Sequence, residues 1–269
     1  MSDEPRLREI NPDQPPAPLD EAAEEKVREL AARQRAANGI IMRAISFAGG
    51  QVEDGMKMLP KGARSQIEGA ARAALTRAYE AASASRRGPF GDRIASDRAH
   101  RVIGTLSGAL GGLGGLPTAL AELPVATTVI FRAVQGVAAA HGEDPATPET
   151  RAECLRVFGA GAPGDSDDGI DTSFVGARLS ITGPALHKLI GKVAPRFAAV
   201  LGQKLASQAV PIIGAAAGAG TNYAFVDYYV EIAHVHFGLR ELARTHGEEA
   251  VLDLFHRTLA ERQVPVRRA

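Results

Sequence analysis

The chain has 269 residues, with 31 acidic and 31 basic side chains and 45% hydrophobic residues. This length suffices for a substantial core, and the balanced charge excludes a global field that would attract nucleic acid or an anionic membrane. The single cysteine, Cys154, excludes an intrachain disulfide and a zinc site built from several cysteines. We therefore expect a cytoplasmic protein with no nucleic-acid partner.

The N-terminal region predicts a disordered lead followed by helices. Residues 1–19 are polar and proline-rich and lack the apolar segment of a secretory signal. Asp20 is a capping residue before an acidic first turn, and apolar residues then recur at three- and four-residue steps. We expect one long helix from Asp20 towards Leu59. An alanine-rich helix over 66–84 should then pack against it as an antiparallel partner.

An uncharged tract follows over residues 102–121. It is long enough to be tested as a membrane span, but its six glycines and Pro117 oppose that assignment. Pro117 would interrupt a helix near the far end of the tract. We favour a helical hairpin with close packing between small residues, and membrane insertion of the tract stays open.

The remaining chain predicts further helices. Thr147 and Pro148 form a capping residue and a first-turn proline for a short helix that ends at Phe158. A glycine- and alanine-rich run leads into a long helix, and Gly247 separates it from the last helix. The predicted segments are 174–181, 184–190, 196–208, 212–245 and 248–261.

No stretch alternates with a period of two residues for long enough to predict a sheet. The chain is therefore predicted to be all-α, a single helical-bundle domain with close-packed glycine- and alanine-rich helices. This domain is expected over residues 20–262, with a C-terminal tail over 263–269.

Four blocks of sequence, in their order and spacing, resemble the EcsC family. The blocks are ELPVATTVIFRAVQGVAAAHGED at 122–144, AECLRVFGAG at 152–161, SFVGAR at 173–178 and VPIIGAAAGAGTNYAFVDYYVEIAHVHFGLRELARTHG at 210–247. The resemblance covers most of the chain from about Ser65 onward. It implies a helical fold and no established catalytic activity. The family's name comes from a gene neighbour of an ABC transporter, which implies a membrane-linked setting.

The long helix carries a candidate metal-binding face. Asp227, Glu231 and His234 stand at positions i, i+4 and i+7, and the last two repeat the i, i+3 spacing of carboxylate-bridged metal sites. Such a site needs ligands from a second helix, for which the candidates are Glu153, Asp171, His187 and His256. The alternative, which we favour, is an acidic face that is solvated or lies between helices.

Four further polar residues are candidates for ligand binding or for structural roles. His236 lies on another face of the long helix, where a hydrogen bond to a backbone carbonyl is the structural interpretation. Asn222 lies in the glycine-rich run, where a close neighbouring backbone would satisfy its amide. Arg132 and Arg178 are lone arginines in apolar helices. Each either pairs with a carboxylate or presents its guanidinium to a phosphate or carboxylate ligand.

Catalytic templates are absent from the sequence. It contains no G-x-x-x-x-G-K-[ST], G-x-S-x-G or H-E-x-x-H motif, so we predict no catalytic residue and no cofactor. We expect a non-enzymatic accessory protein that is peripheral at the inner face of a membrane and is linked to transport or envelope processes. Membrane lipid, a membrane protein complex and a second copy of the chain are the candidate partners. The alternative is a metal-dependent enzyme that uses the acid/histidine face of the long helix.

Overall fold

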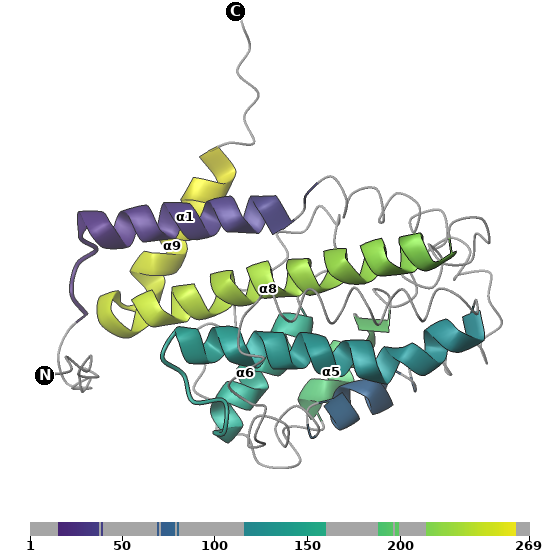
Figure 1. Ribbon diagram of the computed structural model, residues 1–269. Helices are drawn as coiled ribbons and strands as arrows, with labels where there is room; N and C mark the ends of the chain where they lie inside the picture. Colours follow the sequence, from purple (N-terminus) through teal and green to yellow (C-terminus); the bar gives the residue numbers. More distant parts are fainter. Residues whose placement is uncertain are drawn as a thin grey trace, which may run out of the picture.

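The computed structural model shows a helical protein (Figure 1). It describes residues 16–37, 39, 69, 71–78, 80, 116–159, 188–195, 197–198 and 214–261, with side chains left out at 116–123 and 214–222. The labelled helices are α1 (Glu21–Ala37), α5 (Leu116–Ala140), α6 (Pro148–Phe158), α8 (Gly214–His246) and α9 (Glu248–Glu261). These described residues contain no strand, which confirms the predicted all-α class.

Helix α1 begins where the sequence predicts and ends earlier than expected. The Asp20 carboxylate accepts a hydrogen bond from the Ala23 amide at 2.7 Å, which caps the helix. The helix ends at Ala37 and Gly39 is not helical, so the expected continuous helix towards Leu59 is wrong at this point. The physical reason is the Asn-Gly pair after Ala37, a combination that commonly ends helices.

The predicted alanine-rich helix is present over 71–78, where it buries Ala71, Ala74, Leu75 and Ala78. It does not pair with the described part of the first helix, 21–37, while residues 40–59 of the predicted partner lie outside the described residues. Figure 1 shows the short helix beside α5, with α8 and α5 between it and α1. Helix α1 packs instead on α8 and α9. Two polar contacts support this: Arg33 pairs with Glu231 at 3.2 Å, and Arg35 donates to the Thr258 carbonyl at 2.5 Å.

Helix α5 begins inside the first uncharged tract. Pro117 lies in its first turn, where the missing N–H would have no intrahelical partner. The expected interruption of a preceding helix at this proline stays a prediction. Pro124 lies inside the helix, and its carbonyl accepts a hydrogen bond from the Thr128 hydroxyl at 2.7 Å. The rest of the tract, 102–115, lies outside the described residues. Within the part of the chain that is described, no helix is long and apolar enough to cross a membrane.

Helix α6 confirms its predicted start and end. The Thr147 side chain accepts a hydrogen bond from the Thr150 amide at 3.2 Å, and Pro148 occupies the first helical position. Between Ala152 and Phe158 every residue is buried, including Glu153 and Arg156. From Ala152 onward the helix therefore has no exposed face, whereas Pro148 and Glu149 of its first turn are exposed.

Helix α8 is the centre of the fold and packs on α1, α5, α6 and α9 (Figure 1). One hydrophobic cluster lies on its α5 and α6 side, and a smaller one lies on its α1 and α9 side. In the larger cluster, the fully buried ring of Phe158 stacks between the rings of Phe131 and Tyr229, and both distances between ring centroids are 5.0 Å. The ring of Phe197 meets it edge-on at a centroid distance of 5.3 Å. Four segments of the chain therefore meet at one aromatic side chain.

The two C-terminal helices agree closely with the sequence. The predicted segments 212–245 and 248–261 are observed as α8 and α9, which confirms both helices and the break at Gly247. Within the predicted segments 184–190 and 196–208, the described residues 188–190 and 197–198 are helical as expected, and the first helix continues to 195, beyond its predicted end. The segment 174–181 lies outside the described residues. The predicted domain boundaries stay predictions.

The α8–α9 junction is covered by residues from the N-terminal end of the chain. The Ala17 amide donates to the Thr245 carbonyl at 3.1 Å, and His246 Nδ1 lies 3.0 Å from the Pro18 carbonyl, to which it must donate. Gly247 has a φ of 80°, in the left-handed region that favours glycine. An added Cβ there would lie 3.0 Å from the Pro16 ring. Gly247 is thus required both by the left-handed backbone conformation of the turn and by the close approach of the Pro16 ring.

Two glycine turns give a matched stability prediction. Gly142→Ala places a Cβ on a residue with a φ of 76°, in ordinary van der Waals contact with Arg244 Nη2 at 3.8 Å, whereas Gly247→Ala adds a tight contact of 3.0 Å with Pro16 to the same backbone strain. We expect urea unfolding to show a loss of roughly 1–2 kcal/mol for Gly142→Ala and a larger loss for Gly247→Ala. The control, Gly191→Ala at a helical site with no atom within 4 Å, should be neutral or stabilising. Equal losses at the two turns would contradict the contact with Pro16.

Candidate functional site

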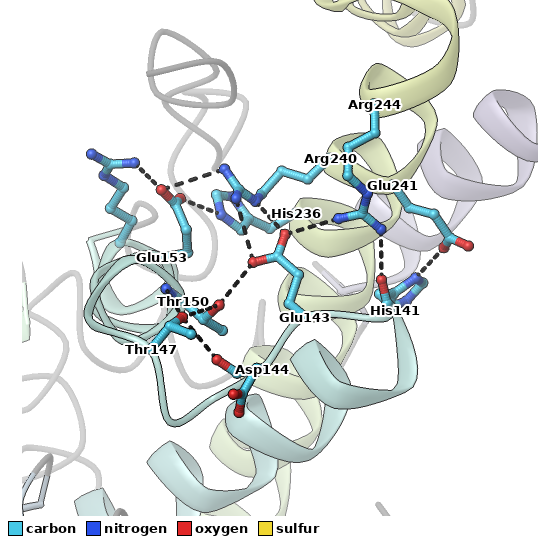
Figure 2. A network of polar contacts seen from close by, with 11 residues as sticks. His141, Glu143, Asp144, Thr147, Thr150, Glu153, His236, Arg240, Glu241 and Arg244 are labelled. Atoms are coloured by element: carbon cyan, nitrogen blue, oxygen red, sulfur yellow. Dashed lines mark hydrogen bonds and ion pairs between the residues drawn. The ribbon is translucent and has the colours of Figure 1, made fainter. Parts of the chain in front are cut away.

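A network of buried ion pairs joins α6 to the C-terminal part of α8 (Figure 2). Its centre is the carboxylate of Glu153, whose side chain is 5% exposed. His236 Nε2 donates to one carboxylate oxygen at 2.9 Å. The other oxygen pairs with Arg156 and lies 3.4 Å from Arg240 Nη1. One buried carboxylate is thus surrounded by donors from two helices.

These donors keep Glu153 ionised. Burial by itself raises the pKa of the Glu153 carboxyl. The hydrogen bond from His236 and the positive charges of Arg240 and Arg156 together lower this pKa by more than burial raises it. The net result is a pKa below the ordinary value of 4.5. A buried charge is tolerated only when it is paired and hydrogen-bonded, so Glu153 and its partners depend on one another.

A second carboxylate, that of Glu143, extends the network to the turn between α5 and α6. It accepts hydrogen bonds from Arg240 Nε at 2.7 Å, Arg244 Nη1 at 3.2 Å and the Thr150 hydroxyl at 3.3 Å. Arg240 therefore bridges Glu143 and Glu153. Burial lowers the pKa of Arg240, but the bond to Glu143 and the charge of Glu153 outweigh this effect and raise it above its ordinary value. The guanidinium stays charged between the two acids.

The turn itself positions Glu143 through backbone hydrogen bonds. The Glu143 amide donates to the Ala138 carbonyl at 3.0 Å and the Gly142 amide to the Ala139 carbonyl at 3.1 Å, the pattern of a Schellman motif with glycine in the left-handed conformation. Asp144 then accepts from the Ala146 amide at 2.9 Å, just before the capped start of α6. The sequence HGEDPATP thus brings Glu143 under α8 with little freedom.

A third group of polar side chains lies beside this network. His141 is the first residue after α5. Its Nδ1 atom lies 2.7 Å from Oε2 of Glu241, and its Nε2 atom lies 3.2 Å from Nδ1 of His234. Its backbone carbonyl accepts a hydrogen bond from Arg244 at 2.8 Å. Burial lowers the pKa of His141, and the bond to Glu241 only partly offsets this effect.

The predicted ligand or structural residues have different outcomes. His236 is buried as expected, but its recorded partner is the carboxylate of Glu153 instead of the backbone carbonyl we expected. Arg132 is half-buried on α5. The side chain of Asn222 and all of Arg178 lie outside the described residues. The roles proposed for Arg132, Arg178 and Asn222 stay predictions.

The residues of the predicted metal-binding face contact different parts of the protein. Glu231 pairs with Arg33 of α1, His234 contacts His141, and Asp227 is half-buried on α8. Of the expected second-helix ligands, Glu153 belongs to the buried network and His256 is exposed on α9, while Asp171 and His187 lie outside the described residues. Over the described ranges, no group of three or more His, Cys, Asp or Glu side chains is placed to hold a metal ion.

Sequence reasoning missed the roles of Glu143, Arg240 and Arg244, and considered Glu153 only as a metal ligand. A signal for part of the network was present. Glu153 and Arg156 stand at i, i+3 in the otherwise apolar stretch 152–158 of a short helix, and His236 and Arg240 stand at i, i+4 on one face of α8. Charged pairs inside apolar helices indicate buried ion pairs when the helices have no free face.

The fold and this network define an all-α protein in which buried ion pairs fix the junction of α5, α6 and α8. Residues 36–242 match the EcsC protein family. The match covers well over half of the chain, so the protein belongs to this family. The searches of curated proteins and of solved structures gave no match.

Proposed function

We propose that the protein is a non-enzymatic EcsC-family accessory protein that binds the surface of a membrane and acts in membrane transport or envelope processes. The contact is made by the end of the molecule where α5 and α8 begin. The observation that carries this proposal is the parallel course of the two helices, because each of them begins in a charge-free stretch of the sequence.

The contacts at the other end agree with the parallel course seen in Figure 1. His141 contacts His234 and Glu241, and Glu143 contacts Arg240 and Arg244, at sequence separations of 93 to 101 residues. A nearly constant separation is expected when two helices run in the same direction side by side. Figure 1 shows both helices beginning at the right of the view and ending at the left.

Charge is distributed unevenly along this pair. The sequence has no charged residue from 102 to 121, or between Lys204 and Asp227, and these stretches contain the first residues of α5 and α8. The ion pairs of Figure 2 lie at the opposite end. The uncharged starts of α5 and α8 can enter the interfacial region of a bilayer without the cost of desolvating charged groups of their own.

Two exposed apolar side chains support this orientation. Val125 on α5 is 54% exposed and Tyr223 on α8 is 41% exposed. Their separation in the sequence falls within the range of 93 to 101 residues found for the contacts above. The two side chains therefore lie at the same height along the paired helices. Tyrosine favours the membrane interface because its ring is apolar and its hydroxyl is polar.

The proposal is tested by flotation of the untagged full-length protein with lipid vesicles. We expect the wild-type protein to float with vesicles of phosphatidylcholine and phosphatidylglycerol. The double variant Val125→Glu/Tyr223→Glu should reduce the bound fraction tenfold or more, since each apolar side chain contributes on the order of 1 kcal/mol or more when it leaves water.

The matched control adds the same two charges to the same helices at their other end. Ala139→Glu/Thr245→Glu changes exposed residues and should float like the wild type. Circular dichroism establishes that both double variants are folded. Absence of wild-type flotation would refute membrane binding, and equal behaviour of the two double variants would refute the assigned end.

A further inference from the structure

Beyond the proposed function, the geometry points to a binding site for a zinc-class divalent cation between His141 and His234, with Glu241 orienting the first ring. The two protein ligands are His141 Nε2 and His234 Nδ1. Water completes the coordination, which is consistent with the absence, in the described part of the chain, of a group of three or more metal-ligating side chains.

The site is built on one face of α8. His234, Gly238 and Glu241 stand at i, i+4 and i+7 and therefore share that face. The His141 ring lies across it, with Nδ1 at Glu241 and Nε2 at His234. A Cβ on Gly238 would lie 2.8 Å from Leu30 of α1 and 3.5 Å from Cε1 of His141. The glycine is thus required by the close approach of α1, and the imidazole lies in ordinary contact distance of the same position.

The hydrogen bonds determine where the protons are. A carboxylate only accepts, so Nδ1 of His141 carries the proton that is donated to Glu241, and Nε2 of the neutral ring carries a lone pair. Nε2 then accepts from Nδ1 of His234. A ligating histidine that donates its other nitrogen to a carboxylate is the arrangement common in metal sites. Metal binding at Nδ1 of His234 requires the other tautomer of the neutral ring, with the proton on Nε2.

The spacing of the nitrogens fits the ion. Two nitrogen ligands that each lie 2.0–2.1 Å from a tetrahedral Zn²⁺ are roughly 3.3–3.4 Å apart, and Nε2 of His141 lies 3.2 Å from Nδ1 of His234. The ring planes meet at 73°, and each ring must turn by roughly 35° for its lone pair to point at a shared tetrahedral ion. Imidazole nitrogens select zinc-class ions over Mg²⁺ and Ca²⁺.

The charges around the site are compatible with a bound cation. Glu241 supplies a negative charge next to His141, whereas Lys26 of α1 and Arg244, which donates to the His141 carbonyl at 2.8 Å, are nearby positive charges. Lys26 is paired with Glu29 at 2.8 Å, which offsets its repulsion.

The test is calorimetric titration of the untagged full-length protein with ZnCl₂ at neutral pH. We expect binding near one equivalent for the wild type and none with MgCl₂. His141→Gln and His234→Gln should each weaken this binding by at least tenfold. Glu241→Gln should retain the site and weaken it by about 10–100-fold, the usual effect of losing a carboxylate partner of a ligating histidine.

The matched control is His256→Gln, which removes an exposed histidine from α9 and should bind zinc like the wild type. Circular dichroism of each variant separates loss of the site from loss of the fold. Zinc binding that is absent in the wild type, or that is unchanged by both His141→Gln and His234→Gln, would overturn the inference. Neither result bears on vesicle flotation, so this inference and the proposed function stand or fall separately.

Discussion

Glu153→Ala is expected to lower the free energy of unfolding by roughly 3–5 kcal/mol, the usual cost of removing one partner from a buried ion pair. Without the carboxylate, Arg156 and His236 lose a buried acceptor and Arg240 loses one of the two acids that it bridges. Urea unfolding followed by far-ultraviolet circular dichroism measures the change. A loss below about 1 kcal/mol would show that the network does not hold α6 on α8.

The matched control is Glu24→Ala, which removes an exposed glutamate paired with Arg28 at 2.7 Å. Exposed pairs are worth at most about 1 kcal/mol, so its loss should be small. The pH dependence is a second control. Because the pKa of Glu153 is below 4.5 in the folded protein, its contribution is complete above that pH and is lost as the pH falls through the folded-state value. The difference between wild type and Glu153→Ala should therefore shrink below about pH 4.5.

Phe158→Ala is expected to lower the free energy of unfolding by about 3–5 kcal/mol through cavity formation in the larger core cluster. The ring is fully buried and stacked on both faces, so three side chains from α5, α8 and the 197–198 segment lose a neighbour at once. Phe158→Leu fills most of the space and should cost less. Urea unfolding of both variants gives the comparison.

Phe255→Ala is the matched control in the smaller cluster between α1, α8 and α9. This ring is also buried, but its recorded ring contact is the exposed His256 at 6.0 Å in a tilted arrangement. Each stacked or edge-on pair adds about 0.5–1.5 kcal/mol beyond the buried area, so Phe158→Ala should cost more than Phe255→Ala. Equal losses would contradict a specific contribution from the stacked rings.

Helix ends in this chain could be predicted because their signals are local. The Asp20 cap, the Thr147–Pro148 start of α6 and the Gly247 break each depend on a few adjacent residues, and each is confirmed. The first helix failed at its C-terminal end because its apolar spacing continued past Ala37. The spacing of apolar residues identifies the buried face of a helix and does not indicate where the helix ends. The Asn-Gly pair that ends this helix is a separate, local signal.

The candidate site could be predicted only in part, because its partners are distant in the sequence. Periodicity placed His236 and Arg240 on one face of the long helix, and both contact Glu153. The identity of that acid, 83 positions away from His236, depends on which helices pack together, and no local pattern encodes this choice. The same limitation applies to His234, which we grouped with its neighbours on α8 and which contacts His141, 93 positions earlier.

The packing of α1 on α8 has a consequence for synthesis of the chain. Arg33 and Glu231 are 198 positions apart, so at translation speeds of about 5–20 residues per second α1 leaves the ribosome about 10–40 s before its partner helix is complete. During that interval Val27, Leu30 and Ala31 have no Val235 or Leu239 to cover them. The nascent protein therefore presents an amphipathic N-terminal stripe to cellular chaperones until its last quarter has been made.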